Sequence, residues 1–87
     1  MGLNFPNPVR RFDPGRSCVC FWGSDAALEI TFQIDFDALR KLGPATGDGE
    51  AAVLSVFDEN RETILKAAAA AYSRGRASYH RLTTASF

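Results

Sequence analysis

The sequence predicts an α+β fold, a two-layer sandwich in which an antiparallel sheet carries one long and one short helix packed on one face. Three observations predict it. Residues 48–74 hold a helical stripe of apolar side chains, residues 27–34 alternate between apolar and wetter positions, and residues 13–16 form a strong turn signal. The expected order of elements is β-β-β-α-α-β, in a single domain spanning residues 1–87.

The chain is expected to begin as an extended arm. Residues 1–8 contain two prolines, and Leu3 and Phe5 are available to pack against the core. A short strand is expected over residues 9–12. The turn after it, Asp-Pro-Gly-Arg, is predicted to be of type II because Gly15 can supply the positive φ.

The second expected strand, residues 17–22, has apolar side chains on both faces, and a turn over residues 23–25 should end it. A strand of this kind is typically central in its sheet, or is covered by the arm or by a second subunit. The third strand, residues 27–34, should pair with it as an antiparallel hairpin. Its apolar positions are Leu28, Ile30, Phe32 and Ile34.

A short helix is expected over residues 35–42, with Asp35 as its cap and Gly43 as its stop. The last element, over residues 77–84, is expected to be an edge strand. Phe87 is expected to fold back on the core or to contact a neighbour.

The long helix is expected to run without interruption over residues 48–74. Asp48 is its expected N-cap, and Gly75 is expected to close it as a left-handed C′ residue. The apolar face of this helix should lie on the third strand. Its members are Val53, Leu54, Phe57, Ile64, Leu65, Ala68, Ala71 and Tyr72.

Arg61 interrupts that apolar face and allows two interpretations. In the first, its stem lies on the core while its charged head reaches a carboxylate or the edge of the sheet. In the second, it is a buried arginine that binds an anionic ligand or fixes a subunit contact. The first is favoured because a charged group on an apolar face is usually paired locally.

Composition is that of a small globular domain, with 46% hydrophobic and 23% charged residues and a formal net charge of zero. A zero net charge argues against a surface designed as a whole for nucleic acid. The charge is nevertheless uneven, because basic ends flank the acidic stretch 24–62, which holds nine acids and three bases, a balance of −6. Neither a signal peptide nor a membrane span is recognisable, and the two cysteines then indicate a cytoplasmic protein.

The residues that could carry chemistry are few. Thiols at Cys18 and Cys20 would point the same way from a strand, about 6.5–7 Å apart, too far for an unstrained disulfide. A zinc site needs four ligands, and the chain adds only His80 to the two cysteines, with any carboxylate partner unspecified. No residue that would orient His80 as a base can be named, and no phosphate-binding loop is present. We therefore expect no catalytic residues, no metal and no cofactor, and interpret the protein as a non-enzyme; a small-ligand or enzyme role around Arg61 or His80 is the least favoured alternative.

Arginines and aromatic side chains form the candidate interaction surface. If the last strand lies near the first hairpin, basic and aromatic groups would gather there, as they do on proteins that bind single-stranded nucleic acid. A solvated basic edge is the commoner outcome. The candidate residues are Arg10, Arg11, Arg16, Trp22, Arg61, Arg76, Tyr79 and Arg81.

Four short motifs resemble those of small bacterial proteins in domain-of-unknown-function family 1488. The motifs are Leu3-Asn4-Phe5-Pro6, Val19-Cys20-Phe21-Trp22-Gly23, Asp37-Ala38-Leu39, and Phe57-Asp58-x-Asn60-Arg61-x-x-Ile64. The resemblance covers nearly the whole chain. It implies a compact bacterial α+β domain without an established activity, and it assigns no catalytic or binding residue.

Taken together, the residues predict a small cytoplasmic domain that acts by protein–protein association, expected to be a homodimer. The reason is the strand over residues 17–22, whose two apolar faces a chain this short would have difficulty covering. The alternative is a nucleic-acid-binding accessory module that uses the arginine-rich hairpin and the C-terminal strand. Membrane association is not expected.

Overall fold

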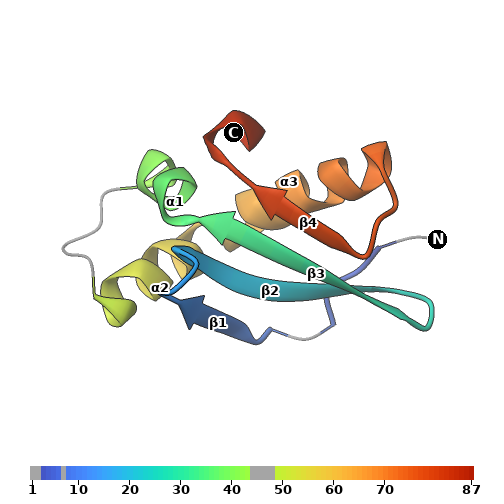
Figure 1. Cartoon of the computed structure of the whole chain (residues 1–87), viewed down its shortest axis with the longest axis horizontal. Coiled ribbons are helices and arrows are strands. Elements are labelled where there is room, and N and C mark those ends of the chain that lie inside the picture. Colours follow the sequence, from blue (N-terminus) through green and yellow to red (C-terminus); the bar gives the residue numbers. More distant parts are fainter. Residues whose placement is uncertain (1–2, 7, 44–48) are drawn as a thin grey trace.

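A four-stranded sheet carries helices on one of its faces, so the fold is α+β in two layers (Figure 1). The computed structural model describes residues 3–6, 8–43 and 49–87. The strands are β1 (Arg10–Asp13), β2 (Cys18–Asp25), β3 (Leu28–Asp35) and β4 (Tyr79–Leu82), and they lie in that order across the sheet. The expected fold class and element order are confirmed, with β2 in a central position.

The expectation of a purely antiparallel sheet is wrong. Strands β1, β2 and β3 pair antiparallel, but β4 pairs with β3 in parallel, with Ile34 opposite Leu82. The helices between β3 and β4 carry the chain back to the end of the sheet where β3 begins, and such a crossover produces a parallel neighbour. The sheet is therefore mixed.

The long helix expected over residues 48–74 is two helices. These are α2 (Glu50–Glu59) and α3 (Arg61–Arg74); α1 (Phe36–Leu42) precedes them, and a 3₁₀ turn, η1 (Thr84–Ser86), follows β4. Asn60 separates α2 from α3 with φ −116° and ψ 18°, and its side-chain amide donates a hydrogen bond to the Val56 carbonyl at 2.9 Å. An asparagine that bonds its own backbone in this way competes with helix continuation, and periodicity alone does not detect it.

The ends of the helices differ from expectation as well. Asp48, the expected cap, lies outside the described residues, and Gly49 occupies the N-cap position of α2. Gly75 is extended, with φ −160°, so the predicted left-handed closure of α3 is wrong. Asp35 stands at the cap position of α1, but its side chain makes no capping hydrogen bond.

Both hairpin turns are placed differently from the prediction. The left-handed residue after β1 is Ser17, with φ 54°, rather than Gly15, so the turn is not of type II. Strand β2 continues through the residues expected to end it, and Ala26, with φ 56°, makes the turn into β3. Pro14 and Gly15 predicted the region of the first turn and Gly23 that of the second. Strand β2, however, remains paired beyond Gly23, to Asp25.

The core lies between the sheet and the helices, as the sequence predicted, but Leu28, an apolar position of β3 expected to face the helix, is 62% exposed beside the β2–β3 turn. Phe32, Phe57, Ile64 and Ala68 are fully buried, and α2 and α3 lie behind the sheet in Figure 1. The ring of Phe57 meets that of Phe21 edge to face, with centroids 5.3 Å apart. The apolar stripe therefore keeps to one side despite the interruption at Asn60. Phe87 is partly buried against the same core.

The N-terminal arm covers one end of β2. Asn4 and Ser24 exchange two backbone hydrogen bonds, of 2.9 and 2.8 Å, and the Phe5 ring lies against Phe21 and Phe32. A Cβ at Gly23 would come within 2.8 Å of Leu3 and 2.9 Å of Phe5. Gly23 thus allows the arm to approach the strand closely.

Candidate functional site

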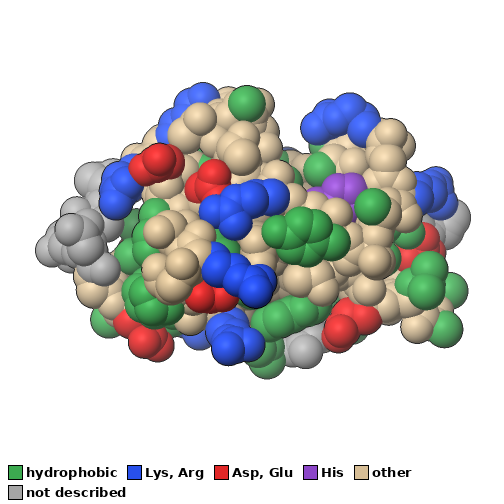
Figure 2. Space-filling view, viewed as in Figure 1, with side chains coloured by type: hydrophobic (Ala, Val, Ile, Leu, Met, Phe, Trp, Pro, Cys, Tyr) green, Lys and Arg blue, Asp and Glu red, His purple; other side chains and the backbone are tan. Residues whose placement is uncertain are grey.

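The sheet face turned away from the helices, which we call the open face, carries two rows of side chains. Directly opposed residues on neighbouring strands point to the same side, so the pairing register defines the rows. The arginine row consists of Arg11, Cys20, Gln33 and Arg81, from β1 to β4. The aromatic row consists of Trp22, Thr31 and Tyr79, about 7 Å further along the strands. Figure 2 shows this face, with basic side chains gathered beside hydrophobic ones.

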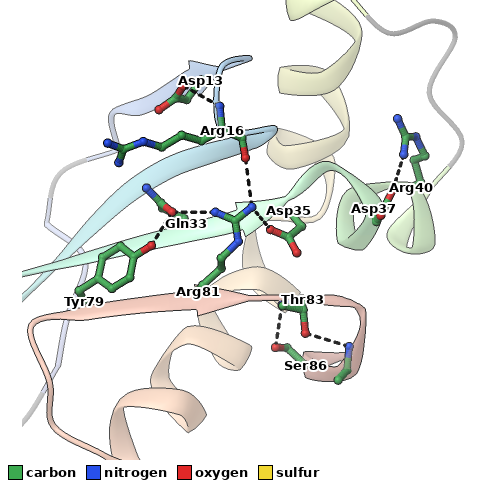
Figure 3. A network of polar contacts seen from close by, with 11 residues as sticks. Asp13, Arg16, Gln33, Asp35, Asp37, Arg40, Tyr79, Arg81, Thr83 and Ser86 are labelled. Atoms are coloured by element: carbon green, nitrogen blue, oxygen red, sulfur yellow. Dashed lines mark hydrogen bonds and ion pairs between the residues drawn. The ribbon is translucent and has the colours of Figure 1, made fainter.

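A polar network joins β3, β4 and the first hairpin (Figure 3). The buried Gln33 carbonyl accepts hydrogen bonds from the Tyr79 hydroxyl at 2.7 Å and from Arg81 at 2.9 Å. The Arg81 guanidinium also donates to the Arg16 carbonyl at 3.1 Å and pairs with Asp35. The network holds Tyr79 and Arg81 in position, although about half of the Tyr79 side chain is exposed.

Arg11 and Arg16 are available to a partner. Both are exposed, and neither guanidinium makes a hydrogen bond or ion pair with any residue that the structure describes. The acids near them are engaged: Asp13 accepts from the Arg16 backbone N–H at 3.2 Å, and Asp35 pairs with Arg81. A backbone hydrogen bond does not neutralise the Asp13 carboxylate, but the two guanidiniums outnumber it, so the balance of charge at this end of the open face is positive.

Five of the eight candidate residues lie together on the open face or at its rim, and three do not. Those on the open face are Arg11, Arg16, Trp22, Tyr79 and Arg81. Arg10 and Arg61 lie on the helix side, at the edge formed by β1 and α2. Arg76 follows α3 and lies over the Tyr72 ring, 5.7 Å from its centroid. The sequence alone could not separate these groups, because the separation depends on strand register.

Arg10 and Arg61 tie the edge of the molecule together around Asp58. Arg10 donates two hydrogen bonds to this carboxylate, at 2.9 and 2.8 Å, and Arg61 approaches it at 3.4 Å. The Arg10 hydrogen bonds hold the pKa of Asp58 below its ordinary value, and the charge of Arg61 adds to the effect. Arg61 also donates to the Pro8 carbonyl and lies over the Phe57 ring. This is the geometry of the first interpretation of Arg61, a locally paired side chain.

His80 lies on the helix side of β4. Its ring stacks on Phe32 and meets Tyr72 edge to face, and Nε2 lies 2.9 Å from the Ala77 carbonyl. The Tyr72 hydroxyl donates to Asp25, which raises the pKa of Tyr72. These contacts account for His80 by packing and by one backbone hydrogen bond.

Two buried thiols and a carboxylate meet at the β1–β2 hairpin. Cys18 and Cys20 lie on the side of the sheet away from the hydrophobic core, and their sulfurs and an Asp13 oxygen all lie within 4.8 Å of one another. Burial, followed by the proximity of Cys20, raises the pKa of Cys18 to about 11. The expected separation of about 6.5–7 Å between the thiols is wrong. That value is the backbone spacing of alternate residues in a strand, and the sulfur atoms themselves lie closer together. Asp13 was missed, although pairing β1 with β2 across the turn would have placed it opposite Cys18.

Two pockets open beside the rows. One, of about 210 Å³, lies against Trp22 and the exposed Leu28 at the β2–β3 turn. The other, of about 240 Å³, contains the pairs Arg81–Asp35 and Arg40–Asp37 in its wall. In the second pocket the charges neutralise one another, so it offers no free charge to a ligand.

These features define a small two-layer α+β domain with one helix-covered and one open sheet face. The family model described as "Protein of unknown function (DUF1488)" matches residues 3–82, and the chain belongs to that family. No curated protein and no solved structure matches the chain significantly. Among the described residues, each helix is too short or too polar to cross a bilayer.

Proposed function

We propose that the protein is a non-enzymatic association domain and that a second copy of the chain binds its open face. The observation that carries the proposal is the arginine row beside the aromatic row, with Arg11 and Arg16 unpaired among the described residues. The family resemblance and the two free cysteines support a bacterial, cytoplasmic setting.

The two rows make the open face complementary to itself. In a two-fold dimer whose axis lies between the sheets and runs across the strands, each chain is reversed along the strand direction. The arginine row of one copy then faces the aromatic row of the other, with Arg81 over Tyr79 of the second copy. Guanidinium groups over aromatic rings are favourable contacts, worth roughly 0.5–1 kcal/mol each where exposed.

The ends of the open face are complementary in charge. Arg16 lies at the β1–β2 turn, and the exposed Glu29 lies at the opposite end, on β3. The reversal that stacks the rows also brings Arg16 of one copy towards Glu29 of the other. Like charges would face each other if the axis ran along the strands, because β1 would then cover β4 and Arg11 would meet Arg81.

The available area sets the expected strength of the dimer. A stable interface buries about 800 Å² on each partner, roughly a sixth of the 5055 Å² surface of this chain. The open face of four short strands, spaced about 4.8 Å apart, has a smaller area than this. We therefore expect a dissociation constant on the order of micromolar and a concentration-dependent dimer.

Sedimentation equilibrium over a concentration series tests the proposal. We expect the wild type to shift from monomer to dimer, and Tyr79→Ala and Arg11→Glu each to weaken association about tenfold. Arg16→Glu should weaken it as well, and adding Glu29→Arg to Arg16→Glu should restore it. Arg74→Glu, an exposed substitution on α3, is the control and should behave like the wild type. A wild type that stays monomeric at several hundred micromolar would refute the proposal, as would equal weakening by Arg74→Glu.

A single-stranded nucleic acid is the second candidate for the open face. The specific observation is that the unpaired Arg11 and Arg16 lie on the same face as Trp22 and Tyr79, a combination of cations and stacking surfaces that binds such strands. Fluorescence anisotropy with a labelled oligothymidine and an oligouridine at low salt separates the two candidates. Binding lost in Arg11→Glu but retained in Arg74→Glu, by a wild type that remains monomeric, would replace the dimer with this function.

A further inference from the structure

We propose that Asp13, Cys18 and Cys20 form a binding site for one zinc ion on the β1–β2 hairpin. The three donor atoms already lie within 4.8 Å of one another. Two sulfurs and one carboxylate oxygen are donors that suit Zn²⁺, whereas calcium and magnesium take oxygen ligands. Cys20 belongs to the arginine row of the open face, but all three donors come from one chain, so the inference does not require the dimer.

Strand geometry brings the donors together. Asp13 and Cys18 are directly opposed across the antiparallel pair β1–β2, so their side chains point to the same side. Cys20 is two residues further along β2 and shares that side. All three belong to one hairpin closed by a four-residue turn, so the site needs no long-range rearrangement to form.

The distances require only a small adjustment. With Zn–S of about 2.3 Å and Zn–O of about 2.0–2.2 Å, ligand atoms in a tetrahedral site lie about 3.5–3.8 Å apart. Closing from at most 4.8 Å to that separation is within reach of small side-chain rotations. The Asp13 carboxylate is oriented by the Arg16 backbone N–H, as carboxylate ligands of metals commonly are.

Charge balance favours the loaded site. On binding, each thiol loses its proton to solvent, and Zn²⁺ with two thiolates and one carboxylate carries a net charge of −1. Arg81 lies close enough to Cys18 to act on its charge. Because Asp35 already pairs with Arg81, the charge that compensates the complex would come from Arg11, which lies directly opposite Cys20 and has no partner among the described residues.

Three protein ligands leave a fourth position open. Structural zinc sites are usually closed by four protein ligands, whereas a site with three holds water or an external ligand. Cys18 is fully buried and Cys20 is 7% exposed, while Asp13 is partly exposed. The open position therefore faces solvent on the Asp13 side, where a small anionic or thiol-containing ligand could complete the coordination.

Cobalt titration and metal analysis of the full chain test the site. We expect reduced, chelator-treated wild type to bind one Co²⁺ with thiolate-to-cobalt charge-transfer absorption. One equivalent of Zn²⁺ should displace the cobalt, and the protein should melt at a higher temperature with Zn²⁺ than without it. Cys20→Ser should abolish the absorption, and Asp13→Asn should weaken binding about tenfold or more. Asp37→Asn, an exposed acid outside the site, and His80→Ala should bind like the wild type.

Several outcomes would overturn the site. The site is ruled out if reduced wild type melts cooperatively, and is therefore folded, but shows no charge-transfer absorption with Co²⁺. Equal Co²⁺ binding by Cys20→Ser would place the metal elsewhere, and loss of binding in His80→Ala would place it at the histidine. A wild type that forms a Cys18–Cys20 disulfide in air and excludes the metal even after reduction would also refute it. Because position 20 is buried, the melting curve of the Cys20→Ser variant without metal must first show that this variant folds.

Discussion

At the scale of single residues, local pairing separates the arginines that support the fold from those free for a partner. Arg10 and Arg61 are held by Asp58, and Arg81 by Asp35 and Gln33. Arg11 and Arg16 have no such partner among the described side chains. The sequence does not distinguish these arginines, because the partners of Arg10 and Arg81 come from distant parts of the chain.

Replacing Arg10 by Met should lower the free energy of unfolding at pH 7 by about 0.2–1 kcal/mol, because its partner Asp58 is substantially exposed and the ion pair is screened. The pKa of Asp58 is lowered in the folded state, so the pair's contribution is present above the unfolded pKa and is lost as pH falls through the folded pKa. Urea unfolding of both proteins at decreasing pH should show the difference shrink below about pH 4. Arg74→Met, which breaks no ion pair with a residue that the structure describes, is the control, and a difference that grows in acid would contradict the assignment.

At the scale of elements, short-range backbone bonding interrupted a helix whose apolar pattern is continuous. Asn60 bonds the Val56 carbonyl and separates α2 from α3, yet Phe57 and Ile64 on either side of it are both buried. The pattern predicted which side chains are buried but not where the backbone breaks. The reason is that burial follows the average direction of a helix face, which a single non-helical residue changes little.

Gly23→Ala should displace the N-terminal arm from β2. The new methyl group would lie 2.8 Å from Leu3 and 2.9 Å from Phe5, closer than packed carbon atoms allow. We expect the free energy of unfolding to fall by about 1–3 kcal/mol, with faster hydrogen exchange at the Asn4 and Ser24 amides, which bond each other's carbonyls.

Gly75→Ala is the matched control for this prediction. Gly75 is extended, and no residue in the described part of the chain lies within 4 Å of the position of its Cβ, so stability should be nearly unchanged. Equal stability of Gly23→Ala and wild type would show that the arm does not pack on β2 as described.

At the scale of the whole molecule, one core between the sheet and the helices carries the stability. Phe57 and Phe32 are both fully buried. Phe57 contacts Phe21 from the helix layer, and Phe32 contacts it from the neighbouring strand β3. In a chain of 87 residues, few other contacts can compensate for the loss of such a ring.

Phe57→Ala should lower the free energy of unfolding by about 3–5 kcal/mol, because it removes the ring and leaves a cavity against Phe21. Thermal melting followed by circular dichroism would show a large drop in the midpoint or no folded state. Leu28→Ala, at an exposed apolar position of β3, should melt close to the wild type. An unchanged melt of Phe57→Ala would remove Phe57 from the core.

The sequence by itself determined the fold class, the strand pattern, the buried side of the helix stripe and most residues of the core, Leu28 excepted, because each depends on a local period of two or about 3.6 residues. The tertiary structure decided the parallel placement of β4, the division of the arginines between two faces, and the meeting of Asp13 with the two thiols. Those depend on strand register and on the path of the chain between distant segments. A periodic pattern carries no information about either, because it describes which side of an element is buried and not which neighbour covers it.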